Sequence, residues 1–255
     1  DDHLFEVVSL RNASIDSVPD NERVSMTKMN LRAGIKAAEN GSFDMAEVYF
    51  KAGRELLGDP GWKDEPGMTI QLYSEGAYAS YVCGDFEAMG RLIDGVLAKD
   101  ISIEAKFRCY EIKILALSAA ADWAPLIDIG MDVRRQLGQS VMRNKPVPLW
   151  KIMKEYMKTD RMLKKVTSDD IATMPQLKDK KVIMGQLMME RILAGAYHAQ
   201  PTMIPMMIFN MVQTSIRHGN NASACIAFAS MAMLYQCVFG NPSKASDLVV
   251  AADHP

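Results

Sequence analysis

The sequence predicts an all-α protein of about ten helices that stack in pairs as an α-α superhelix. Three observations lead to this prediction. Apolar and small residues recur at three- and four-residue spacings through most of the 255-residue chain, as they do along one face of a helix. Turn residues, mainly Gly, Asn and Pro, separate these segments. One short turn motif also returns twice along the chain.

The first helix pair is predicted over residues 22–57. Apolar and small residues recur with helical spacing in its first half. Gly41 is expected to end that helix, because glycine tolerates the left-handed conformation at a helix end. Ser42 is expected to cap the next helix, and the sequence "GDPG" at 58–61 ends it.

The turn motif defines the repeats. "GSFDMA" at Gly41 is followed by "GDFEAM" at Gly84, 43 residues later, and by the weaker "ADWAPL" at Ala121, a further 37 residues on. Repeats of about 20–50 residues indicate stacked units that bury their faces on one another. We therefore predict three helix pairs over 22–138, preceded by a lead-in over 1–21.

The first repeat resembles a tetratricopeptide unit, with Gly41 as its turn glycine. Residues of small or aromatic type fall on that unit's packing positions: Gly34, Ala37, Phe43, Ala46, Phe50 and Gly53, with Pro60 near the end. These residues suit either a ligand pocket or two closely packed helices. We favour packing, because no cluster of convergent polar groups accompanies them. On this interpretation Phe50→Ala should cost about 3–5 kcal/mol.

The regular pattern lapses after Gly138. Residues 139–177 are predicted to hold a loop, a basic helix at about 149–166 and a connector with Ser168 as a cap. Further helical repeats are predicted over 178–255, with helices at 179–199, 203–218 and 222–239 and one more starting near the end. We expect this array to be truncated in mid-unit, which would leave Val249 and Val250 partly exposed.

Composition and motifs argue against catalysis. The net charge of −2 gives no global attraction to nucleic acid or to an anionic membrane. No phosphate-binding loop, dinucleotide fingerprint or kinase signature occurs, and the four His form no HxxxH or HExxH pair. We therefore predict no enzyme activity, metal or cofactor for this segment. The four cysteines, at 83, 109, 225 and 237, are predicted to be reduced and mostly buried in a cytoplasmic protein.

A basic helix is the main candidate binding feature. Ten Lys or Arg but only two acids lie between Arg134 and Lys165. Spacings of four, three and four residues place four of these cations on one helical face: Lys154, Lys158, Arg161 and Lys165. Ile152, Met153 and Tyr156 are expected on the opposite face. Two interpretations remain. The face is either a surface for an anionic partner, namely an acidic protein segment, a phosphate or the less favoured nucleic acid, or a solvated face.

Charge is scarce near the C-terminus, where Arg217 is the only unambiguous charge between Arg191 and Lys244. A membrane hairpin is one explanation. However, polar residues and two prolines interrupt 192–216, and the apolar segment 224–238 is shorter than the roughly 20 residues that a span needs. Central helices covered on both sides explain the pattern better, so we predict no membrane segment.

The order of several segments resembles the helical-repeat region of large multidomain signalling ATPases. The segments are "LFEVV", "ERVSMTKMNLRAGIKAAENGSFDMAEVYFKAGRELL", Trp62, "GDFEAM", "YEIKILAL", "TMP" and "PTMIPMMIFNMVQTSIRHGNNASACIAFASMAML". In that family an AAA-type ATPase module, often preceded by a kinase-like domain, leads into such repeats. GAF and histidine-kinase domains often follow. The resemblance covers Leu4 to about Leu248, and no ATP-binding or kinase residue of the family falls within it.

Two functional hypotheses follow. The first is a non-catalytic scaffold for protein–protein interaction or regulation within a larger signalling ATPase or kinase, with a protein or another domain of the parent chain as its partner. The second is a mechanical arm of an ATP-dependent assembly whose catalytic domains lie elsewhere. Because the chain starts at Asp1 rather than Met, we expect it to be a piece of a longer protein.

Overall fold

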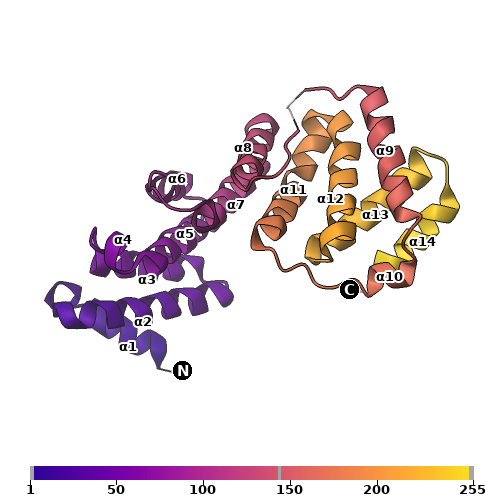
Figure 1. The fold of residues 1–255 in the computed structure, drawn as a ribbon. Coiled ribbons are helices and arrows are strands. Elements are labelled where there is room, and N and C mark those ends of the chain that lie inside the picture. The colour runs from indigo at the N-terminus through magenta and orange to yellow at the C-terminus, as the bar shows by residue number, and fades with distance from the viewer. Residues whose placement is uncertain (1–2, 143–144, 253–255) are drawn as a thin grey trace. The chain divides into compact units, whose positions relative to one another are not determined.

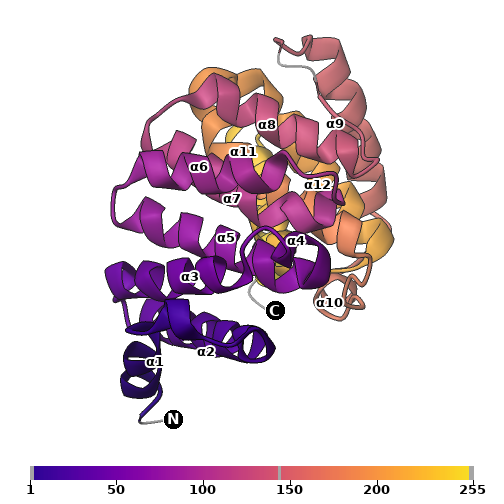
Figure 2. The same ribbon diagram turned by 90° about the vertical axis from the view of Figure 1, so that its left-hand side faces the viewer.

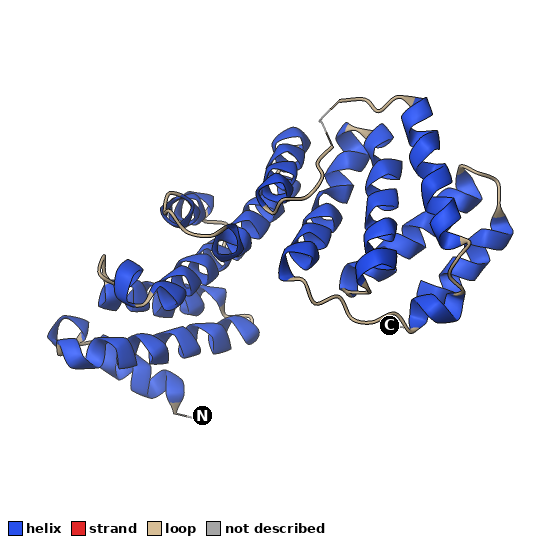
Figure 3. Ribbon diagram, viewed as in Figure 1, coloured by secondary structure: helices blue, strands red, loops and turns tan. Residues whose placement is uncertain are grey.

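The computed structural model describes residues 3–142 and 145–252, with the side chains of 250–252 outside the description. Within these ranges the protein consists of fourteen α-helices and two short 3-10 helices, without a strand (Figure 1, Figure 3). The all-α class is therefore confirmed, while the expected count of about ten helices is too low. None of the helices in the described part of the chain has the length and hydropathy of a membrane span.

The chain separates into two compact units, residues 1–116 and 117–255. The first unit begins with α1 (Leu4–Asn12), a 3-10 turn at Ile15–Ser17 and α2 (Asp20–Glu39). It continues with α3 (Phe43–Leu57), α4 (Gly61–Asp64), α5 (Pro66–Val82), α6 (Phe86–Leu97) and most of α7 (Ile103–Ala119). Figure 2 shows α2, α3, α5 and α6 as successive layers of this unit.

The second unit begins with the end of α7, followed by α8 (Trp123–Gln136), α9 (Leu149–Leu163) and α10 (Ser168–Ala172). It continues with α11 (Lys180–Ala199), a 3-10 turn at Pro201–Met203, α12 (Ile204–His218), α13 (Ala222–Cys237) and α14 (Pro242–Ala252). Helix α12 is central, and Met207, Phe209 and Met211 on it are almost completely buried. Burial in a protein core therefore accounts for the scarcity of charge in this part of the sequence.

The same turn ends three helices, α2, α5 and α7, and a second helix follows it each time. Gly41, Gly84 and Ala121 have φ angles of 79°, 79° and 54°. The next residue in each turn donates its N–H to the carbonyl five residues earlier, at 2.9 Å: Ser42 to Ala37, Asp85 to Ser80, and Asp122 to Leu117. This bond, with a left-handed residue before it, is the Schellman motif. The predicted turn positions are confirmed.

Close helix packing explains the small residues of the first repeat. A Cβ atom at Gly34 would overlap the ring of Phe50, and one at Gly53 would lie 2.7 Å from Leu72. Phe50 is 1% exposed and Ala46 is fully buried. These small and aromatic residues therefore pack two helices together, as expected, and do not line a ligand pocket.

The structure corrects several local expectations about helices. The short helices α1, α4 and α10 were missed, because segments of 9, 4 and 5 residues show little periodicity. Ser42 makes no side-chain capping bond. Thr167, rather than Ser168, caps α10 through a capping box with Asp170.

The environment of the cysteines also differs from the expectation. Only Cys109 is buried, whereas Cys225 is half-buried and Cys83 and Cys237 are exposed. The two exposed thiols lie at helix ends, where the chain turns away from the core. Val249 is 49% exposed, as expected, and the side chain of Val250 lies outside the described residues.

Candidate partner-binding site

Helix α9 is anchored in the second unit by its inner face. The ring of Tyr156 stacks on Phe239 with ring centroids 3.8 Å apart. Thr159 is fully buried and accepts a 2.9 Å hydrogen bond from the Gln213 amide on α12. These contacts fix the rotation of α9 about its axis, and so determine which of its residues face solvent.

All four predicted cations are exposed, and three of them lie on the outer side of α9: Lys154, Lys158 and Arg161. The helix ends at Leu163, three residues earlier than expected, so Lys165 follows two residues beyond it. Lys158 pairs with Glu155 at 3.3 Å. Among the residues that the structure describes, no carboxylate lies within ion-pair distance of the other three. We call these four cations the basic strip.

Glu155 beside the strip is held in its charged form. Partial burial alone would raise the pKa of this carboxyl group. Hydrogen bonds from Gln213 and Lys158, with the charges of Lys158 and Lys154, outweigh burial and lower it. Glu155 therefore neutralises part of the strip's charge near Lys154 and Lys158.

Large apolar side chains also face solvent on α9. Trp150 is 69% exposed, Met153 39% and Met157 49%. The expectation that Met153 lies with Ile152 and Tyr156 is wrong, because the contacts of Tyr156 turn that position outward. The sequence did carry a signal, since residues 150, 153 and 157 have helical spacing on one face.

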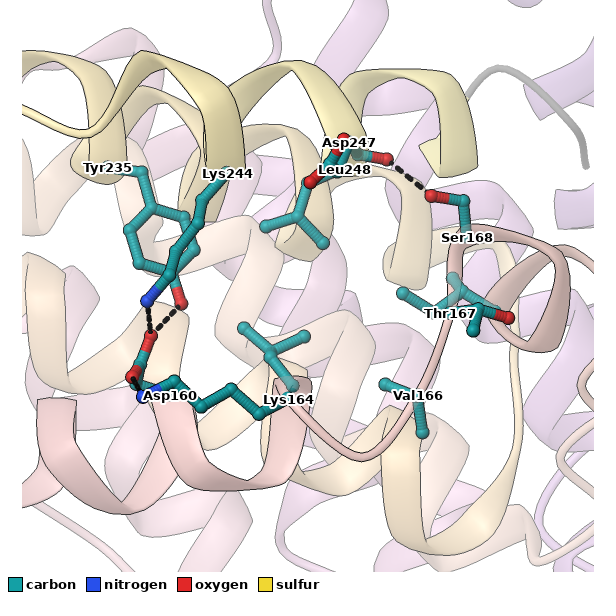
Figure 4. Close-up of a pocket in the computed structure, with 11 residues that line it drawn as sticks. Asp160, Lys164, Val166, Thr167, Ser168, Tyr235, Lys244, Asp247 and Leu248 are labelled. Atoms are coloured by element: carbon teal, nitrogen blue, oxygen red, sulfur yellow. Dashed lines mark hydrogen bonds and ion pairs between the residues drawn. The ribbon is translucent and has the colours of Figure 1, made fainter.

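Asp160 is the charged residue of α9 that points inward (Figure 4). It is 8% exposed and accepts a 2.8 Å hydrogen bond from the Tyr235 hydroxyl on α13. Lys164 lies 3.1 Å from its other oxygen, and Lys244 on α14 pairs with it as well. Burial alone would raise the pKa of Asp160, but the bonds from Lys244, Tyr235 and Lys164 lower it overall. Burial and the bond to Asp160 raise the pKa of Tyr235.

A cavity of about 410 Å³ lies beside this network, between α9, α10, α13 and α14. The polar groups that line it form hydrogen bonds and ion pairs with one another. Asp160 already has three donors, and the Ser168 hydroxyl donates to the Asp247 carbonyl at 2.9 Å (Figure 4). A base of lowered pKa and a serine without an adjacent base do not form a nucleophilic centre. We interpret the network as structural.

A second cavity, of about 320 Å³, lies between α9 and α12, and Lys151, Lys158 and Arg217 are among the residues that line it.

Arg134, which the sequence count included among the basic residues, is 2% exposed. It donates to the Gly185 carbonyl and to Asn210, and burial lowers its pKa to about 10. Arg134 therefore belongs to the core rather than to the basic surface. Within the described ranges, no three His, Cys, Asp or Glu side chains gather where they could hold a metal ion.

Comparison with known proteins gives one partial similarity. A "Hybrid signal transduction histidine kinase G" of Dictyostelium discoideum is 25% identical to the chain over 107 residues. The match covers 38% of this chain and 3% of that protein. No family model and no solved structure matches the chain.

Proposed function

We propose that this chain is a non-catalytic, tetratricopeptide-like scaffold that binds an acidic protein segment within a larger signalling protein. The repeated turn at Gly41, Gly84 and Ala121 supports tandem helix pairs. The similarity to a signal transduction histidine kinase supports the signalling context, and the whole protein's activity is part of the proposal.

The observation that carries the proposal is the excess of positive charge on the basic strip, where Glu155 is the acid that pairs with it. On a solvated helical face, an acid three or four residues away can pair with a cation, as Glu155 pairs with Lys158. Lys154, Arg161 and Lys165 have no such ion pair within the described residues. Lys154 and Arg161 lie about 10 Å apart along α9, at about 1.5 Å per residue, and Lys165 follows just beyond the end of the helix. An acidic segment supplies the missing charges.

Affinity capture with charge-reversal variants tests the proposal. Lys154→Glu with Arg161→Glu reverses the strip, while Lys178→Glu with Lys180→Glu makes the same charge change at exposed positions elsewhere in the unit. Partners are identified by mass spectrometry at about 0.1 M and about 1 M salt, where the Debye length is about 10 Å and about 3 Å. We expect one acidic partner to be lost in the strip variant and at high salt, and kept in the control. Identical partners for all three proteins would reject the proposal in favour of a solvated face.

A further inference from the structure

The outer face of α9 combines charge with exposed apolar surface. Of the fifteen large hydrophobic side chains that are exposed in the described part of the chain, four lie on this helix: Leu149, Trp150, Met153 and Met157. Exposed apolar residues that cluster in this way mark interaction sites, whereas singly scattered ones do not. Trp and Met are also enriched at protein interfaces. We call Trp150, Met153 and Met157 the apolar stripe.

The spacing of the apolar stripe fits a second helix. Its members are separated by three and then four residues, which is the a, d, a spacing of one coiled-coil heptad. The next d position is Asp160, which turns inward, so the exposed stripe is about two helical turns long. In that register Lys154 and Arg161 both occupy the e position, directly beside the stripe. The g positions, Tyr156 and Leu163, turn toward the core, where Tyr156 stacks on Phe239. Cations therefore border the stripe along one edge only.

We infer that the outer face of α9 binds an acidic amphipathic helix. Apolar residues of that helix would pack on Trp150, Met153 and Met157, and its Asp or Glu side chains would pair with Lys154 and Arg161. The inference rests on the proposed function and adds the partner's secondary structure and residue pattern. Charge complementarity favours an acidic helix as the partner. Lys154 and Arg161 have no carboxylate within ion-pair distance among the described residues. Charges at e positions determine partner choice in paired helices.

An anionic lipid surface is the other large anionic occupant of a basic amphipathic helix. Interfacial helices bury their main apolar face in the lipid. In α9 the main apolar face is already committed to the core through Tyr156 and its contacts with Phe209, Tyr235 and Phe239. Only the narrow stripe remains exposed, which favours a second helix over a lipid surface.

The test uses a dye-labelled synthetic peptide of about five helical turns, with Leu at its a and d positions and Glu beside them. Its binding to the full chain is followed by fluorescence anisotropy at low and high salt. Trp150→Ala with Met157→Ala removes the stripe, and Lys154→Glu with Arg161→Glu reverses the charge. The apolar control is Ile226→Ala with Met233→Ala, an exposed pair on α13 with the same seven-residue spacing. The charge control is Lys178→Glu with Lys180→Glu.

We expect each α9 variant to bind at least about tenfold more weakly, as for a central interface residue, and each control to bind within about twofold of the wild type. A scrambled peptide of the same composition should bind at least about tenfold more weakly as well. All substituted side chains are exposed, and circular dichroism checks that the variants remain folded.

Three results would overturn the inference. Loss of binding in the charge variant alone would reject the amphipathic helix and leave the proposed function standing. Binding of the scrambled peptide as tight as that of the designed peptide would also reject the amphipathic helix and leave the proposed function standing. If the peptide fails to bind while vesicles containing anionic phospholipid bind the wild type and neither α9 variant, the face is a lipid-binding surface instead. The proposed function is judged separately, by the capture experiment.

Discussion

The Tyr235 hydroxyl on α13 donates a 2.8 Å hydrogen bond to the Asp160 carboxylate on α9, across 75 residues of sequence. Lys164 and Lys244 pair with the same carboxylate. A buried carboxylate is stable only when its oxygens are well bonded. The network therefore joins α9, α13 and α14 and orients the helix that carries the basic strip.

Tyr235→Phe should destabilise the protein by about 1.5–3 kcal/mol, because it removes a hydrogen bond to a charged acceptor that is shielded from water. Tyr197→Phe, at a residue that is 66% exposed, is the matched control and should leave stability unchanged. Urea denaturation measures both. A loss below about 0.5 kcal/mol for Tyr235→Phe, within the range of ordinary surface changes, would contradict a structural role for this bond.

Stability should fall on acidification, partly through Asp160. Its pKa is lowered in the folded protein, because its hydrogen bonds outweigh burial. Its unfolded pKa is about 3.9, so the unfolded chain binds a proton first as the pH falls. The contribution of Asp160 is therefore complete well above that value and is lost as the pH falls through the folded pKa. Asp160→Asn should lower stability at pH 7 and flatten the acid limb of a stability–pH profile. An unchanged acid limb would count against this assignment.

Two glycines of the first unit should respond to alanine in opposite directions. At Gly34 a Cβ overlaps the Phe50 ring, so Gly34→Ala should cost about 1–3 kcal/mol through overpacking. At Gly90, inside α6, no atom lies within 4 Å of the added Cβ. Gly90→Ala should therefore stabilise the helix by about 0.5–1 kcal/mol. Thermal denaturation of the two variants checks the difference in sign, and equal effects would reject the packing argument.

Replacement of Ala121 by glycine should stabilise the protein. It is the only non-glycine with positive φ in the described part of the chain, at 54°, and this conformation costs an L-residue about 1–2 kcal/mol. Ala121→Gly should recover much of that cost. Gly84→Ala, at the matching turn position with φ of 79°, should lose a similar amount. Urea melts of both variants test this, and a destabilised Ala121→Gly would show that the strain is absent.

Local signals in the sequence predict most of the fold. Gly41 and Gly84 predict the turns in which they lie, because glycine is favoured where φ is positive. Ala121 was found only through its similarity to the other two turns, since alanine gives no such signal. The sequence does not predict the helices α1, α4 and α10, because they are short and take part of their order from tertiary contacts. One such contact is the tilted packing of Trp62 in α4 against Tyr73, with ring centroids 4.8 Å apart.

The site was predictable only where it depends on one helix. Spacing alone places Lys154, Lys158 and Arg161 on one face of α9, whereas Lys165 lies beyond the end of the helix. The inward position of Asp160 depends on Tyr235 and Lys244, which are 75 and 84 residues away in sequence. The position of Met153 likewise depends on Phe239, because the stack with Tyr156 sets the rotation of the helix. Pairings at such separations leave no periodic trace in the sequence.

The repeated turn also determines where this array can change length. Its closing bonds run between backbone atoms, so they survive replacement of most neighbouring side chains. The first helices α2, α5 and α7 have 20, 17 and 17 residues, and the second helices α3, α6 and α8 have 15, 12 and 14. Length therefore varies at the helix ends away from the turn and in the joint that follows each second helix, where α4 occupies the joint between α3 and α5. Engineered insertions, affinity tags or new chain termini belong at these joints, where they leave the pairing of the helices in place.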